Sequence, residues 1–141
     1  NTQNNIHLNG YGHEDLSHIT DSLKTQLLAK PYGAIPMMIE AIHFNEKKPE
    51  NKNIALTNKK ENRIKVFTGD KWIYKNKDET INDLVDGKYF ILDCHYEENC
   101  NNLSKNVQDT YQKFQYKYSE EDKKFLDSLK SECELVLLNN R

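Results

Sequence analysis

The stretch IALTNKKENRIKVFTGDKWIY, residues 54–74, contains three short runs of β-prone side chains at 54–56, 64–67 and 72–74. Within these runs β-branched and aromatic residues are common, and the hydrophobic period is two rather than the helical 3.6. Residues 58–62 and the sequence Thr68-Gly69-Asp70 between the runs are rich in turn formers. The pattern predicts a three-stranded antiparallel meander whose second turn is a Gly-Asp hairpin.

A sheet this small needs helices against one face to be stable, and the flanking sequence supplies helical patterns. Thr20 precedes a helix expected at about 21–29, which must end before Pro31. Pro36 is expected to open a second helix that leads into His43. A third helical segment is expected at about 79–85, with Gly87 behind it as its stop signal.

The last third of the chain is predicted to form two helices. One apolar stripe runs through 103–118, and a second runs through 125–137. Between them, residues 119–122 read Ser-Glu-Glu-Asp and have the form of a capping box that starts the second helix. We therefore expect an α+β fold: a small three-stranded antiparallel meander packed with helices, ending in an antiparallel helical hairpin.

Length and composition indicate one domain spanning 1–141, because 141 residues can surround a single core. No apolar run approaches the length of a membrane span, and the amino end has no signal-peptide pattern, so neither a membrane partner nor secretion is expected. Three cysteines are too few for a disulfide framework, which favours an intracellular, reducing compartment. The polar, Asn-rich start at 1–5 suggests the carboxyl-terminal part of a longer chain.

Positive charge is concentrated in the middle of the chain. Residues 44–77 hold ten basic side chains against four acidic ones, a net charge of +6, whereas the whole chain carries −2. Lysines with interleaved aromatic residues favour phosphate contacts combined with base stacking, although lysines also serve to solvate a strand and protect a sheet edge. The candidate nucleic-acid-binding residues are Lys59, Lys60, Arg63, Lys65, Lys71, Trp72 and Tyr74.

Two further groups of residues have side chain types that could carry chemistry. His43-Phe44-Asn45 followed by Pro49-Glu50-Asn51 is faintly similar to half of an HNH nuclease motif, in which a His activates water beside a metal; His43 and Asn51 would carry it. A His at a helix end also caps the last carbonyls. Cys94, His95 and Cys100 are zinc-ligand types, but one loose cluster lacks the four ligands of a structural site. No metal or other cofactor is therefore expected.

Read as a whole, the chain resembles the carboxyl-terminal domain of uncharacterised giant-virus proteins of the mimivirus type, in which a two-Cys two-His zinc finger and a coiled coil often come first. Relatives in that group often have His near positions 48 and 52, where this chain has Lys48 and Lys52, which weakens a nuclease role and adds to the basic segment. The resemblance is carried by NGYGHEDLSHIT at 9–20, IHFN at 42–45, PENKNI at 49–54, LTNKK at 56–60, KFQYKY at 113–118 and ELVLLNNR at 134–141.

The resemblance implies a domain carried behind a nucleic-acid-binding finger and a dimerising coil, located in the host cytoplasm, the viral factory or the virion. Together with the charge pattern, it favours a non-enzymatic module of a viral protein that binds nucleic acid or protein. The expected partners are DNA or RNA, a second copy of the chain, or another viral protein. The alternatives are a divergent HNH-like metal-dependent nuclease and a viral structural or assembly domain.

Overall fold

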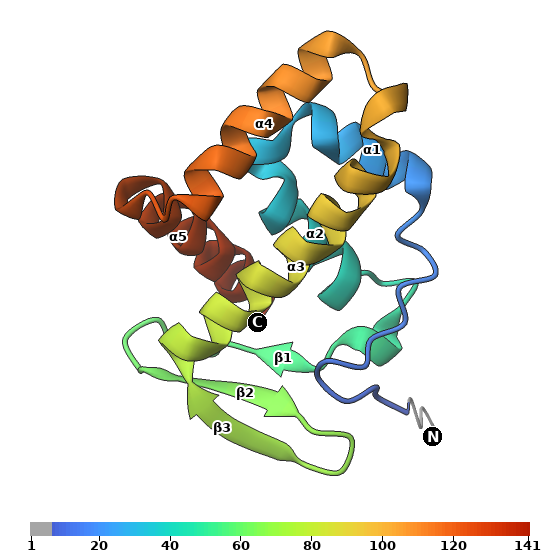
Figure 1. Ribbon diagram of the computed structural model, residues 1–141. Coiled ribbons are helices and arrows are strands. Elements are labelled where there is room, and N and C mark those ends of the chain that lie inside the picture. Colours follow the sequence, from blue (N-terminus) through green and yellow to red (C-terminus); the bar gives the residue numbers. More distant parts are fainter. Residues whose placement is uncertain (1–6) are drawn as a thin grey trace.

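The computed structural model describes residues 7–141, so the Asn-rich start at 1–5 lies outside the described residues. Over this range the chain forms five α-helices and one three-stranded antiparallel sheet. Figure 1 shows the sheet at one end of the molecule, with the long helix α3 leaving the sheet and crossing the helical part. The expected α+β class, a small meander packed with helices and followed by a helical carboxyl-terminal region, is confirmed.

The sheet has the predicted order. Strands β1 (Ile54–Ala55), β2 (Arg63–Phe67) and β3 (Trp72–Asn76) are neighbours in sequence order, and both pairs are antiparallel. The β2–β3 connection is the expected Gly-Asp hairpin: the Thr68 amide donates to the Lys71 carbonyl at 2.9 Å, and Gly69 has φ +100°. A positive φ at the first central position is what a tight hairpin requires, and Gly adopts it without steric cost.

The first two helices pack against the other helices, α1 against α3 and α4, and α2 against α3 and α5. Helix α1 (Asp21–Ala29) is capped by the Thr20 side chain, which accepts from the Leu23 amide, and it ends before Pro31 as predicted. Helix α2 (Ala34–His43) begins two residues before Pro36, so the expected start at Pro36 is wrong. A 3-10 turn at Pro31–Gly33 runs directly into α2, and Pro36 is tolerated in the first turn because amides there have no intrahelical partner.

Helix α3 (Lys77–Asn99) is far longer than the segment predicted at 79–85. The Asn76 side chain caps its first turn by accepting from the Glu79 amide at 2.9 Å. Gly87 lies inside this helix, so the prediction that it ends the helix is wrong. One Gly costs a helix interior only about 1 kcal/mol relative to Ala, which the packing of a helix of 23 residues offsets.

Helices α4 (Lys105–Ser119) and α5 (Lys123–Asn139) follow a 3-10 turn at Cys100–Asn102. The capping box expected to start at Ser119 does not form, because Ser119 still belongs to α4. Instead Glu121 adopts φ 53°, the Asp122 amide donates to the Lys117 carbonyl, and the Asp122 side chain caps α5 by accepting from the Phe125 amide. Beyond this turn α5 packs mainly against α2 and α3 rather than along α4.

The core lies between α2, α3, α5 and the inner face of the sheet. Helix α2 lies at the centre of this core, and strands β1 and β2 contribute apolar side chains from the inner face of the sheet. Another 3-10 turn, Pro49–Asn51, leads from α2 toward β1. No helix within residues 7–141 combines the length and the apolar character that a membrane span requires. The fully buried apolar side chains of α2 are Ala34, Ile35, Met38, Ile39 and Ile42.

Candidate nucleic-acid interface and a buried polar network

The strand register puts four of the seven predicted binding residues on one face of the sheet. Ile64 and Val66 of β2 are buried against the core, so the alternate residues point to the other side. Across from them on β3, Tyr74 pairs with Lys65 and Trp72 pairs with Phe67. We call the exposed side the outer face; it carries Arg63, Lys65, Phe67, Trp72 and Tyr74.

The outer face combines exposed aromatic rings with a central cation. Trp72 is 40% exposed and Tyr74 is 63% exposed. The Lys65 Nζ atom lies 6.0 Å from the Trp72 ring centroid and 5.9 Å from the Tyr74 ring centroid. Phe67 supports the Trp72 ring from one side, with the ring centroids 5.7 Å apart. Two rings are thus held in the open, with a positive charge between them.

The other three predicted residues lie at the two ends of this face. Lys59 and Lys60 are exposed in the β1–β2 connection, next to Arg63, and Lys71 is exposed at the β2–β3 turn, next to Trp72. Within residues 7–141 none of the five predicted cations, Lys59, Lys60, Arg63, Lys65 and Lys71, forms an ion pair with a carboxylate.

Lys48 and Lys52, which the sequence analysis added to the basic segment, behave differently. Lys48 pairs with Asp15 at 2.8 Å, and Lys52 pairs with Glu46 at 2.9 Å. Their charge is therefore partly neutralised inside the protein. The available positive charge of the basic segment is concentrated on the β2–β3 hairpin and the connection before it.

A hollow of about 230 Å³ extends the outer face beyond Trp72. Trp72, Ala55 and Thr57 line it together with the basic residues Lys52 and Arg141. The Arg141 guanidinium is held there by a hydrogen bond to the Thr57 carbonyl at 3.4 Å. Arg141 was not among the predicted residues, and no local pattern could have found it, because its partner is 84 positions away in the sequence.

Asn51, one of the two residues of the nuclease hypothesis, is a buried clamp. The segment 9–15, here called the strap, crosses the 3-10 turn at Pro49–Asn51 and the β2–β3 hairpin. Asn51 Oδ1 accepts from Asn9 Nδ2 at 3.0 Å and from the Asp15 amide at 2.9 Å, and Asn51 Nδ2 donates to the Asp15 carbonyl at 2.8 Å. Every polar atom of this fully buried side chain is used to fasten the strap.

The strap also reaches the sheet. The Tyr11 amide donates to the Phe67 carbonyl at 2.6 Å, which fixes the strap to the last residue of β2. Gly10 is buried at this crossing, where an added Cβ would stand 2.9 Å from the Thr68 carbonyl oxygen. Only Gly therefore allows the strap to lie this close to the hairpin.

His43, the other residue of the nuclease hypothesis, belongs to a chain of buried polar groups. Its Nδ1 lies 2.9 Å from Asn53 Oδ1, and its Nε2 lies 2.8 Å from Lys88 Nζ. Because an amide oxygen only accepts, Nδ1 carries the proton and Nε2 accepts from Lys88. Asn53 Nδ2 in turn donates to Glu14 Oε2 at 2.7 Å. The chain runs from Lys88 on α3 through His43 and Asn53 to Glu14 on the strap.

Burial sets the protonation of this network. It lowers the pKa of His43 to about 4, with the Lys88 charge acting in the same direction, and it lowers the pKa of Lys88 to about 8. Burial alone would raise the pKa of Glu14, but the positive charge of His43 and Lys88 and the hydrogen bonds from Asn53 and Gly12 outweigh it, so that pKa is lowered. At neutral pH His43 is uncharged and Glu14 is ionised.

These positions favour a scaffold role for His43 and Asn51. Both side chains are fully buried, and both ring nitrogens of His43 are engaged within the protein. In the zinc-type cluster, His95 is buried near the end of α3 and pairs with Thr25 Oγ1 at 2.8 Å, while Cys94 and Cys100 are half-buried free thiols. Within residues 7–141 no group of three or more His, Cys, Asp or Glu side chains has an arrangement that could hold a metal ion.

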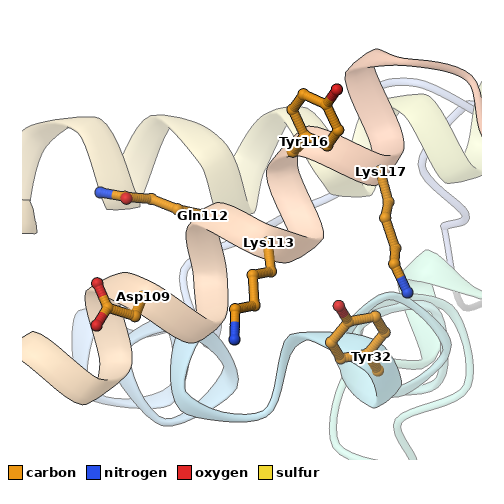
Figure 2. Close-up of a pocket in the computed structure, with 6 residues that line it drawn as sticks. All are labelled: Tyr32, Asp109, Gln112, Lys113, Tyr116 and Lys117. Carbon is orange, nitrogen blue, oxygen red and sulfur yellow. The ribbon is translucent and has the colours of Figure 1, made fainter.

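A larger but shallow hollow, of about 510 Å³, lies against α4 (Figure 2). Lys113 and Lys117 project from the same side of α4, and Lys117 points toward the Tyr32 ring. Lys117 Nζ stands 5.5 Å from the Tyr32 ring centroid, and Asp109 pairs with Lys105 at 2.9 Å. The cation–π contact and the ion pair use side chains of an exposed helix face, as is common on protein surfaces, so we assign this hollow no function.

No protein-family model, no curated protein and no solved structure matches the chain.

Proposed function

We propose that this domain is a non-enzymatic module that binds single-stranded nucleic acid on the outer face of its sheet. The observation that supports this most directly is the exposed pair Trp72 and Tyr74 with Lys65 between them. Bases of an unpaired strand stack on exposed aromatic rings, and each stacked base contributes about 1–3 kcal/mol. In a duplex the base faces are covered, so the rings favour a single strand.

The charge of the hairpin supports the same proposal. Arg63, Lys59 and Lys60 lie at one end of the face, and Lys71 lies at the other. The two acidic residues of the hairpin region, Glu61 and Asp70, are in the connections rather than on the outer face. A strand that follows the face would therefore meet a cation at each end and stacking rings between them. The giant-virus setting expected from the sequence, in the host cytoplasm or the viral factory, is part of this proposal.

Binding is tested by the fluorescence anisotropy of a labelled single-stranded oligonucleotide, first at low salt and then in a salt series. If about three phosphates are neutralised, log K should fall with log salt at a slope of about −2 for a single strand. Trp72 is the only Trp of the chain, so quenching of its emission should follow the same binding curve. A duplex of the same sequence should bind more weakly at equal salt.

Variants separate charge from stacking. Replacing Lys59, Lys60 and Arg63 together by Glu should abolish binding, whereas the matched change of the exposed Lys113, Lys123 and Lys124 to Glu should leave most of it. Tyr74→Ala should weaken binding by about 1–3 kcal/mol without changing the salt slope. Absence of binding at low salt, or binding indifferent to the Glu changes on the hairpin, would contradict the proposal and favour a protein partner for this face.

A further inference from the structure

A further pocket lies between the strap and α3, away from the outer face of the sheet. Its volume is about 270 Å³, below the roughly 300–1,000 Å³ of pockets for drug-sized ligands, so it suits a small molecule. The strap contributes Glu14, Leu16 directly follows the strap, and one face of α3 contributes Gly87, Lys88 and Ile91. Gly87 leaves this wall open, because a Cβ added there would meet nothing within 4 Å.

Lys88 is an unusual residue for such a wall. It is 6% exposed, and it forms no ion pair with a carboxylate of residues 7–141. Its Nζ instead donates to the neutral Nε2 of His43 at 2.8 Å. Buried lysines are usually paired with an acid, since an isolated ammonium is costly to remove from water. The nearest carboxylate of the network is that of Glu14, and it is reached only through His43 and Asn53.

The groups around Lys88 leave much of its amine neutral. Burial lowers its pKa to about 8, opposed by the negative charge of Glu14 from the strap and by the Cys133 thiol of α5. His43 faces it from α2, and Asp83 of α3 lines the same pocket. At pH 7.5 a pKa of about 8 leaves about a quarter of the amine unprotonated, against about a thousandth for an ordinary lysine. An unprotonated lysine amine is a nucleophile for carbonyl groups, and the Lys88 side chain lines the pocket.

We propose that Lys88 is a covalent site for small aldehydes that enter the pocket between the strap and α3. The Lys88 nitrogen adds to the carbonyl carbon to give a carbinolamine. The two protons of the amine and the carbonyl oxygen then leave as water, and a C=N bond joins the lysine to the former aldehyde carbon. No oxidant or reductant takes part. Glu14 of the strap lines the same pocket, and its ionised carboxylate can pass a proton during the loss of water.

The walls define which aldehydes fit. Leu16, Leu84 and Ile91 present apolar surface, and the acidic residues Glu14 and Asp83 repel negative charge. The ligand class is therefore a small uncharged aldehyde, and phosphorylated or carboxylated aldehydes are disfavoured.

The experiment is reductive trapping on the intact chain. The protein is treated with benzaldehyde and sodium cyanoborohydride at pH 7.5, and each modified lysine is located by peptide mass spectrometry. The unprotonated fraction of the amine is about two orders of magnitude larger for Lys88 than for an ordinary lysine, whereas burial restricts the access of the aldehyde to Lys88. We therefore expect Lys88 to react about tenfold faster than Lys59 or Lys60. Its rate should level off above pH 8, while theirs continue to rise. In place of benzaldehyde, 4-formylbenzoate should react at Lys88 much more slowly.

Gly87→Leu is the matched control, because it fills the pocket and leaves Lys88 in place. It should reduce the trapping at Lys88 at least fivefold and leave the exposed lysines unchanged, and circular dichroism should show an intact fold. Lys88→Met should remove the fast phase altogether. The proposal is overturned if Lys88 of the unmodified chain reacts no faster than the exposed lysines, or if Gly87→Leu folds and leaves the rate unaffected. Neither result depends on nucleic-acid binding.

Discussion

Replacing Asn51 by Ala tests the scaffold role that the structure gives to this residue. The change removes three hydrogen bonds to the strap, two to Asp15 and one to Asn9. At a net value of about 0.5–1.5 kcal/mol each, their loss should lower the free energy of unfolding by about 2–4 kcal/mol. The strap can detach while the core stays folded, so the loss is limited to the free energy that docks the strap. Urea denaturation measures it.

Hydrogen exchange locates the effect. The Tyr11 amide, bonded to the Phe67 carbonyl, should lose protection in Asn51→Ala, while amides in the middle of α2 should keep most of theirs. Asn51→Asp should be at least as damaging, because a second oxygen would then face the Asp15 carbonyl. Asn106→Ala, at an exposed position of α4, is the control and should change stability by less than about 0.5 kcal/mol. A similarly small change for Asn51→Ala, with the Tyr11 amide still protected, would show that the Asn51 side chain does not hold the strap in place.

Four further outcomes are expected. Gly87→Ala should raise stability by about 0.5–1 kcal/mol in thermal denaturation, since the site is helical and has room for a methyl group; a lower melting temperature would count against it. Glu121→Gly should also stabilise, by about 1 kcal/mol, because Gly adopts positive φ without strain; a loss would show that the Glu side chain matters. Leu129→Ala should cost about 2–5 kcal/mol in a urea titration, and a cost below 0.5 kcal/mol would mean that α5 does not pack as described. Between pH 6.5 and pH 4 the unfolded chain binds more protons at position 43 than the folded one, so acidification should remove up to about 3 kcal/mol of stability; an NMR titration of His43 with a midpoint near 6.5 would contradict this.

The sequence was informative where the signal is local. The alternation in residues 64–67 and the Gly69-Asp70 turn predict the hairpin, because strand period and turn chemistry are properties of neighbouring residues. The prediction that a helix ends at Gly87 failed, because the sequence around a Gly inside a long helix resembles that around a Gly that follows a short helix. Tertiary packing decides between the two. The residues of the outer face could be named in advance, but their convergence on one face depends on the register between β2 and β3.

The buried network was missed, although one of its members left a signal in the sequence. Asn51 and Asn53 meet partners that are 36 to 44 positions away, and an Asn before a strand is as typical of a turn as of a clamp. Lys88 did leave a signal: it continues the apolar stripe of Ile81, Leu84 and Val85 at helical spacing, which places it on the buried side of α3. A lysine in such a stripe indicates a buried amine.

The strap connects two surfaces of the fold. Of its residues only Gly10 is fully buried, so the hydrogen bonds of Asn51, together with the packing of Tyr11 against the core, hold it closed. It forms one wall of the Lys88 pocket, and it is bonded to the Phe67 carbonyl at the end of the outer face. An element of this kind opens as a unit at low free-energy cost. A ligand of either surface that binds the closed strap better than the open one must, by thermodynamic reciprocity, tighten binding at the other by the same factor.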